Sequence, residues 1–411
     1  MKTAMSWAHQ HSAQGLPFKS PEPRPLDPAA SAHLDLIRAL AAWAVMWGHL
    51  RALFFLNAQQ LPSANGLVKI LYFLSGFGHQ AVMVFFVLSG FLISSSIFRN
   101  YALGTWSWRN YFIHRAARLY AVLIPGLLLS LLWDKAGSSL FASSGLYTHP
   151  LEDLGSAVAA DGLTARDFLG NVFFVQTIFT RTFGSNGPLW SLANEFWYYV
   201  LFPVAFFAGL AWAGRSFRRA VSLSGVAVVL MALLGLEKLA GFVVWMAGSA
   251  LVIAHLRAER LAGRWLSLWL LCSSLAVSAC LLLVRMGHFQ GAGSDILLGL
   301  TFTLFLLGVL QVKLGARNER YQALAGFSAA FSYTLYVVHF PLLLCLRAWL
   351  APSQRWRPDG AHLFYAALIG AAVIVLSWLI SLPTEGKTYD LRKWLMHKAI
   401  FGGRPRRSRA E

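Results

Sequence analysis

Long apolar runs constrain this chain more than any other feature of its sequence. Each run covers about twenty residues, the length that a helix needs to cross the hydrocarbon core of a bilayer. None alternates with the period of a β-strand, and a segment in lipid must satisfy its backbone hydrogen bonds internally. The sequence therefore predicts an all-α, polytopic membrane helical bundle of about ten transmembrane helices. The runs span residues 34–56, 77–98, 116–133, 187–212, 219–236, 239–256, 265–284, 294–314, 326–350 and 361–382.

Composition and charge agree with a membrane protein and exclude an ordinary soluble enzyme. Charged residues make up only 13% of the 411 residues, against about 25% in a soluble domain. The formal net charge is +18, and with the N-terminus inside, the cytosolic loops hold about three times as many Lys and Arg as the external loops. This bias predicts that both termini are cytosolic. The basic excess is thus a topology signal, and we expect contact with lipid headgroups but not with nucleic acid.

We predict three parts along the chain. Residues 1–33 form a flexible cytosolic tail, because they contain several prolines and no apolar core of a signal peptide. Residues 34–390 form a single membrane domain, and residues 391–411 form a basic cytosolic tail. Within the long loop 134–186, the apolar segment 168–180 is too short to span and is expected to be interfacial or re-entrant.

The first apolar run contains charged and titratable residues, which are energetically costly inside a membrane and therefore indicate a pairing or a functional role. Arg38 and His49 are 11 positions apart, so they lie on one face of a helix, about 16 Å apart along its axis. Asp35 lies one turn before Arg38 and could pair with it. A simpler interpretation remains open, in which Arg38 reaches the headgroups and His49 makes a core hydrogen bond.

The fourth run begins with a polar, aromatic stripe and contains a carboxylate. Trp190, Ser191, Glu195 and Tyr199 follow one another at helical spacing. A carboxylate at this depth must face the bundle and find a partner there. A structural ion pair for Glu195, and membrane-interface anchoring by the aromatic residues, are the simpler alternatives.

Two further runs carry polar residues at helical spacing. Ser332, Tyr336 and His339 share one face of the ninth run. By the predicted topology His339 lies in the outer half of the membrane, as do His49 and Glu195, so we hypothesise that these three side chains converge. A hydrogen-bonded core histidine is the alternative for His339.

The second run and the following loop add two candidates of other kinds. Ser89 precedes Gly90, a pair that lets two helix backbones approach closely, and we favour this packing role over a nucleophilic serine. Arg115 and Arg118 are one helical turn apart and could form a fork for phosphate groups; ordinary cytosolic positive charge is the alternative. The sequence contains no metal-ligand pattern, so no metal is expected.

Taken in order, these segments resemble the acyltransferase 3 family of bacterial integral-membrane O-acyltransferases. Two positions depart from the pattern of many relatives: Met83 replaces a polar residue, and Glu385-Gly386-Lys387 stands where Glu-x-Pro is common. The resemblance covers residues 34 to about 390, and we expect a stand-alone membrane domain. Its motifs are L-D-x-x-R…H at Leu34–His49, F-F-V-L-S-G-F-L-I at Phe85–Ile93, R-x-x-R at Arg115–Arg118, W-S-L-x-x-E-x-x-Y-Y at Trp190–Tyr199 and S-Y-x-x-Y-x-x-H-x-P at Ser332–Pro341.

The resemblance implies transfer of an acyl group, usually acetyl, from acyl-CoA to a hydroxyl of a surface or secreted glycan or glycolipid, in the bacterial cytoplasmic (inner) membrane. Acyl-CoA would be a substrate, with no bound cofactor. On this basis His49 is the predicted catalytic base, oriented or charge-balanced by Glu195, and a transient acyl-histidine is the alternative route. Arg38, Arg115 and Arg118 are predicted to bind the donor. Residues predicted to line the acceptor side or to support the site are Asp35, Ser89, Trp190, Ser191, Tyr199, Ser332, Tyr336 and His339.

Two functions of other classes fit the same polar residues. A transporter or flippase for a lipid-linked or small polar molecule would also need intramembrane Arg, His and Glu, although the sequence shows no internal repeat of the kind many transporters have. A non-catalytic scaffold of a polysaccharide assembly complex is the third possibility. Saturable binding of CoA would distinguish the acyltransferase from the transporter and the scaffold.

Overall fold

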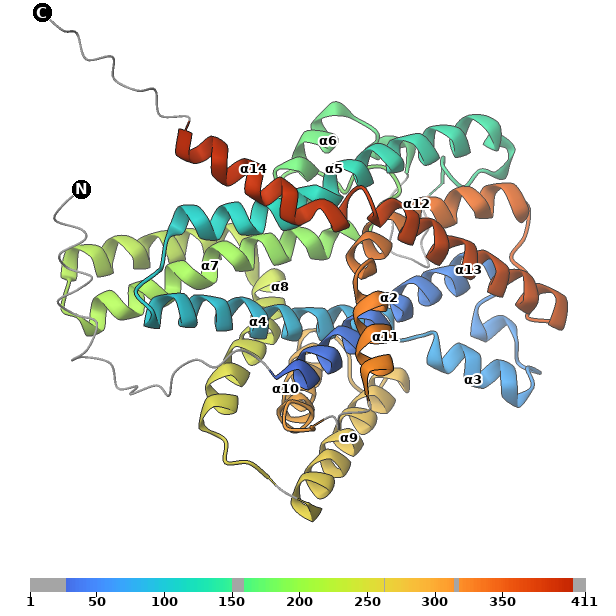
Figure 1. Cartoon of the computed structure of the whole chain (residues 1–411). Coiled ribbons are helices and arrows are strands. Elements are labelled where there is room, and N and C mark those ends of the chain that lie inside the picture. Colours follow the sequence, from blue (N-terminus) through green and yellow to red (C-terminus); the bar gives the residue numbers. More distant parts are fainter. Residues whose placement is uncertain (1–26, 150–158, 262, 314–317, 402–411) are drawn as a thin grey trace, which may run out of the picture.

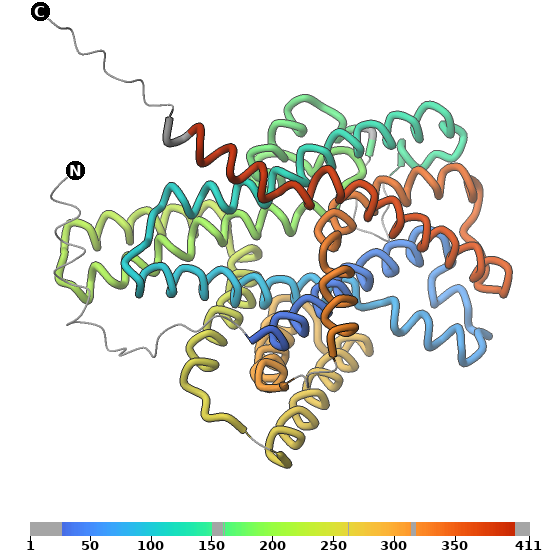
Figure 2. The backbone as a smooth tube through the Cα atoms, in the orientation of Figure 1, coloured from blue at the N-terminus to red at the C-terminus, as the bar shows by residue number. Residues whose placement is uncertain are grey.

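The computed structural model describes residues 27–149, 159–261, 263–313 and 318–401, and within these ranges every long element is an α-helix (Figures 1 and 2). The helices of the first half are α2 (Pro28–Phe54), α3 (Gly66–Leu74), α4 (Gly78–Ala102), α5 (Trp108–Leu140), α6 (Ala165–Val172) and α7 (Leu189–Ala213). Those of the second half are α8 (Phe217–Arg257), α9 (Arg264–Arg285), α10 (Ala292–Val309), α11 (Glu319–Ala329), α12 (Ser332–Leu350), α13 (Gly360–Ser381) and α14 (Thr388–Phe401).

The predicted helical membrane bundle is confirmed. Within the described residues, nine helical stretches are long and apolar enough to cross a membrane. One of them, α8, is 41 residues long and is interrupted at Gly235, whose φ of 72° belongs to the left-handed region that glycine adopts without strain. The break divides α8 into the fifth and sixth predicted runs. Each of the ten predicted runs is therefore helical over most of its length.

Several predicted boundaries are wrong by a turn or more. The third helix begins at Trp108 rather than 116, because Ser107 caps it by accepting a hydrogen bond from the backbone of Asn110. The first helix begins at Pro28, inside the predicted tail 1–33, because Asp27 caps it and proline suits the first helical position. Residues 1–26 lie outside the described residues.

Two other segments differ from their predicted form. The ninth run is not one helix: it is broken at Ala330 and Phe331, which separate α11 from α12. Of the predicted tail 391–411, the part up to Phe401 is helical and belongs to α14, which runs along α5 (Figure 1); residues 402–411 are not among those described. The segment 168–180 does not span, as predicted, and only Ala165–Val172 is helical there.

Helices α4 and α8 cross at backbone contact through two glycines. A Cβ atom on Gly90 would collide with the carbonyl oxygen of Trp245, and one on Gly248 would collide with the carbonyl oxygen of Val87. Small residues allow two helices to approach this closely, so that α4 and α8 touch through their backbones at this crossing. The predicted packing role of Ser89-Gly90 is confirmed for the glycine.

The helices that carry the polar motifs form the interior of the bundle. Helix α2 packs on α4, α11 and α12, and α12 also packs on α5. In Figure 1, α9 and α10 lie below α4, and α8 runs from beside α7 across α4 toward them. The interior is therefore built from α2, α4, α5, α7 and α12, the helices on which the sequence places its candidate site residues.

Candidate active site

Two pockets lie within the interior helices. The first, here called the arginine pocket, has a volume of about 600 Å³ and is lined from α2, α4, α5, α7, α12 and α14. The second, the histidine pocket, has a volume of about 630 Å³ and is lined from α2, α4, α7, α12 and the segment 162–187. Arg38 lines the first and His49 the second. The two residues that the sequence places on one face of one helix thus reach different pockets.

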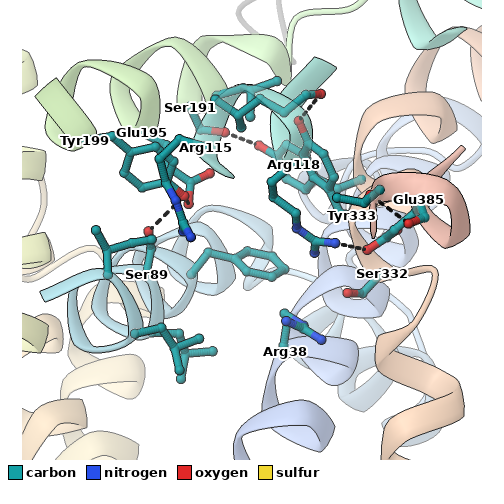
Figure 3. A pocket seen from close by; sticks show the side chains of 18 of the residues that line it. Arg38, Ser89, Arg115, Arg118, Ser191, Glu195, Tyr199, Ser332, Tyr333 and Glu385 are labelled. Carbon is teal, nitrogen blue, oxygen red and sulfur yellow. Dashed lines mark hydrogen bonds and ion pairs between the residues drawn. The ribbon is translucent and has the colours of Figure 1, made fainter. Parts of the chain in front are cut away.

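The three arginines predicted to bind a donor meet in the arginine pocket (Figure 3). Arg38 pairs with Asp35 at 2.9 Å, as predicted from their spacing. Arg115 lies over the rings of Tyr111 and Tyr199, with its Cζ 5.9 Å from each centroid. A cation held over aromatic faces keeps its charge and leaves its N–H groups available.

Arg118 is held by a carboxylate that the sequence analysis did not select. Its Nη1 lies 2.9 Å from Oε1 of Glu385, whose side chain is only 4% exposed. The other carboxylate oxygen of Glu385 accepts hydrogen bonds at 3.0 Å from the backbone N–H and the hydroxyl of Thr334. These donors belong to the first turn of α12, where a negative charge is favourable.

The signal for Glu385 was present in the sequence. It is an acidic residue directly after the last apolar run, in a chain with only 17 Asp and Glu residues. Its partner is not evident from the sequence, because the first turn of α12, which it caps, lies 51 positions earlier in the chain.

A chain of hydrogen bonds ends on Glu195, the other carboxylate of the arginine pocket. Tyr199 donates to Oε1 of Glu195 at 2.6 Å, Ser89 donates to the hydroxyl of Tyr199 at 3.3 Å, and the indole of Trp245 donates to Ser89 at 3.2 Å. This partner of Glu195 is a tyrosine one turn later on α7. Glu195 and His49 line different pockets, so the hypothesised convergence of His49, Glu195 and His339 fails for Glu195.

His49 pairs instead with His339. Nδ1 of His49 lies 2.8 Å from Nε2 of His339, and the two rings are stacked with centroids 5.1 Å apart. His339 is fully buried, and its Nδ1 lies 3.0 Å from the carbonyl oxygen of Leu335 and 2.8 Å from that of Tyr336. The convergence of these two histidines, from residues 290 positions apart, is therefore confirmed.

These contacts define the protonation pattern of the neutral pair. A carbonyl oxygen only accepts hydrogen bonds, so Nδ1 of His339 carries the proton and its Nε2 has a lone pair. That lone pair must accept from Nδ1–H of His49, which leaves the lone pair of His49 on Nε2. Among the described residues, Nε2 of His49 has no hydrogen-bond partner. The pair thus holds an imidazole base in a fixed tautomer at the histidine pocket.

One wall of the histidine pocket is a polar segment anchored on α5. The fully buried carboxylate of Asp134 accepts hydrogen bonds at 2.7 Å from the backbone and the hydroxyl of Ser185. Asn186 donates to the hydroxyl of Ser130 and to the carbonyl of Val337. These buried bonds fix the segment that brings five hydroxyl-bearing or aromatic side chains to the pocket: Thr177, Thr180, Thr182, Ser185 and Trp190.

The remaining predicted residues divide between the two pockets. Trp190 lies against His79, with ring centroids 6.2 Å apart, in the histidine pocket. Ser191 and Ser332 line the arginine pocket, and the hydroxyl of Ser332 is used in a bond to the carbonyl of Ala329. Tyr336 lines both pockets. The catalytic, donor-binding and acceptor-side roles predicted for these residues stay predictions.

Comparison with known proteins gives one curated relative. The chain is 27% identical over 183 residues to the Bacillus subtilis (strain 168) protein named "Putative peptidoglycan O-acetyltransferase YrhL". The matched segment covers 43% of this chain and 24% of the relative, so the chain spans only about a quarter of the relative's length. No solved structure matches the chain.

Residues 31–382, which extend from α2 to the end of α13, match the model of the acyltransferase domain family. This range includes the arginine motifs of α2 and α5, the Glu195 segment of α7 and both histidines of the His49–His339 pair. The chain therefore belongs to the acyltransferase 3 family, and it is a multi-pass membrane protein.

Proposed function

We propose that the protein transfers an acyl group, acetyl in the first place, from acyl-CoA in the arginine pocket to a hydroxyl of a glycan or glycolipid in the histidine pocket. The observation that carries this proposal is the His49–His339 pair, which presents a hydrogen-bond-accepting imidazole nitrogen to one pocket beside a second pocket rich in arginine. The acetyl group and the glycan are suggested by the name of the curated relative.

The arginine pocket suits the phosphates of a CoA donor. Arg38, Arg115, Arg118 and Arg392 line it, and two carboxylates only partly offset their charge. Arginine binds phosphate oxygens through two parallel N–H groups, which favours it over lysine for this task. By the predicted topology, in which both termini are cytosolic, this pocket faces the compartment in which CoA is made.

The histidine pocket suits a polyhydroxylated acceptor. Its lining offers several hydroxyl groups and the indole of Trp190, and Arg181 and two histidines are its only titratable basic side chains among the described residues. Hydroxyls can exchange hydrogen bonds with sugar hydroxyls in either direction, and an indole gives an apolar face to a sugar ring. By the predicted topology this pocket faces outward, toward surface or secreted glycans.

The proposed reaction is a general-base acyl transfer. Nε2 of His49 takes the proton of the acceptor hydroxyl as its oxygen attacks the thioester carbonyl carbon. The C–O bond forms, the C–S bond breaks, and the CoA thiolate leaves and takes up a proton, so that acyl-CoA and alcohol become ester and CoA. His339 acts through His49: it keeps the base in the reactive tautomer and can share the positive charge of the imidazolium.

The decisive experiment uses purified full-length protein in proteoliposomes with acetyl-CoA labelled in its acetyl group. Loss of thioester and capture of label by an acceptor panel are followed for the wild type, for His49→Ala and for His255→Ala. His255 is the matched control, because it lies in α8 and lines neither pocket. We expect turnover in the wild type and in His255→Ala, and none in His49→Ala.

Other results would redirect the proposal. Equal transfer by His49→Ala would remove His49 from the reaction. Label that stays on wild-type protein in the absence of acceptor, and is lost from His49→Ala, would favour the acyl-histidine route. No CoA binding and no turnover by folded wild-type protein would favour the transporter or scaffold.

A further inference from the structure

The two pockets are separated at one place by two side chains. Of the residues that line the pockets, Val82 of α4 and Tyr336 of α12 line both. Both side chains are buried, at 5% and 7% exposure. The partition between the pockets is therefore one side-chain layer thick at this point.

The phenol of Tyr336 is fixed from both sides. Its hydroxyl donates to the carbonyl oxygen of Pro188 at 3.0 Å, and it shares a short hydrogen bond with the hydroxyl of Ser191. Pro188 lines the histidine pocket and Ser191 the arginine pocket. The ring edge also meets Phe85, with centroids 5.8 Å apart. Tyr336 is therefore the fixed side of the boundary, and Val82, which makes no side-chain hydrogen bond, forms its other side.

This boundary stands between the proposed donor site and the proposed base. Arg38 and His49 lie on one face of the same helix, about 16 Å apart along its axis, and each lines a different pocket. For His49 to act on an acyl group whose CoA phosphates stay with the arginines, the thioester end of the donor must reach across the partition. Val82 is the aliphatic member of that partition, and its two methyl groups occupy room that a longer acyl end of the donor would need there.

We propose that Val82 and Tyr336 form the passage between the two pockets and that Val82 sets the length of the acyl group the protein transfers. This inference rests on the proposed function, since it assumes a CoA donor in the arginine pocket and a base in the histidine pocket. A small change in the space of an apolar site discriminates between acyl chains of different length. One methylene group more or less changes kcat/KM by about 10-fold or more.

The test compares acetyl-, propionyl- and butyryl-CoA as donors for the wild type, Val82→Ala, Val82→Ile and Val45→Ala, with the dissociation constant of CoA measured for each. Val45 is the matched control: it is a buried valine that lines the histidine pocket only. We expect Val82→Ala to raise kcat/KM for butyryl-CoA relative to acetyl-CoA by about 10-fold. Val82→Ile lowers transfer from all three donors and leaves CoA binding unchanged, and Val45→Ala keeps the wild-type ratio.

The results distinguish this inference from the proposed function on which it rests. An active Val82→Ala protein with the wild-type donor ratio would overturn the passage while leaving the acyltransferase proposal in place. The same shift of ratio in Val45→Ala would also overturn it, since the effect would then come from general loosening of the core. Wild-type protein that neither binds CoA nor consumes any acyl-CoA would overturn both.

Discussion

The interior and the periphery of this bundle are both built from apolar helices, but the two regions differ in the polar residues that they carry. In α12, 72% of the residues in the apolar window are buried within the protein, whereas in α9 the share is 11%. Helix α12 contributes Ser332 and Tyr336 to the pockets and His339 to the pair with His49, whereas α9 contributes no residue to either pocket. In a membrane, apolarity gives no reason for helices to associate with one another, so specific polar contacts and close packing distinguish the inside from the lipid-facing side.

The largest expected effect on activity comes from removing His339, the fully buried member of the histidine pair. His339→Ala removes the group that fixes the tautomer of His49, so we expect kcat to fall about 100-fold with little change in the KM for acyl-CoA. His33→Ala is the control, because His33 also makes a ring hydrogen bond, to Tyr321, but lines neither pocket. Steady-state kinetics in proteoliposomes measure kcat and KM for both variants. An equal loss of kcat in His339→Ala and His33→Ala would contradict a specific role of His339.

A comparison of two glycines tests the packing of the interior. Gly90→Ala places a methyl group against the carbonyl oxygen of Trp245, whereas a Cβ at Gly225 meets no atom within 4 Å. We expect Gly90→Ala to lower the free energy of unfolding by about 1–3 kcal/mol and Gly225→Ala to raise it by up to about 1 kcal/mol. Thermal unfolding in detergent measures both, and equal stability of the two variants would contradict backbone contact between α4 and α8.

The ion pair of the arginine pocket has a smaller expected effect, confined to the donor. Arg118→Ala removes a phosphate ligand in the proposal, and we expect the KM for acyl-CoA to rise about 10-fold. Arg109→Ala, an exposed arginine on the same helix that lines neither pocket, should keep the wild-type KM. An unchanged KM in Arg118→Ala would place the CoA phosphates elsewhere.

The smallest effect is expected at the periphery. Leu275 in α9 is 60% exposed, so Leu275→Ala should change the free energy of unfolding by less than about 0.5 kcal/mol and leave kcat unchanged. Loss of several degrees in melting temperature, or of activity, would show that α9 is covered by another protein surface and that the contrast with α12 is incomplete.

The sequence predicts what is local to one helix. The spacing of Arg38 and His49 follows from 3.6 residues per turn, the Asp35–Arg38 pair follows from adjacency on a turn, and the ten runs follow from the thickness of a bilayer. The sequence does not place helices around a bundle. For that reason Glu195 was paired with His49, whereas the structure gives it Tyr199 as its partner.

Other parts of the site depend on contacts between distant segments. Glu385 acts on the first turn of α12, and Asp134 of α5 fixes a segment 51 residues later. No periodicity or motif in the sequence predicts either of these contacts. The division into two pockets with a shared boundary likewise depends on how several helices pack together, and no single apolar run predicts it.

The glycine contact between α4 and α8 has a consequence for how the protein can diversify. Val82 lies eight positions before Gly90 on α4, a helix whose place is set by backbone contact. A backbone pinned in this way cannot adjust to a larger group by shifting, as a surface loop could. Under the proposal that Val82 sets the acyl length, a change of donor preference therefore requires the exchange of a side chain on α4 or α12 and not a movement of the backbone.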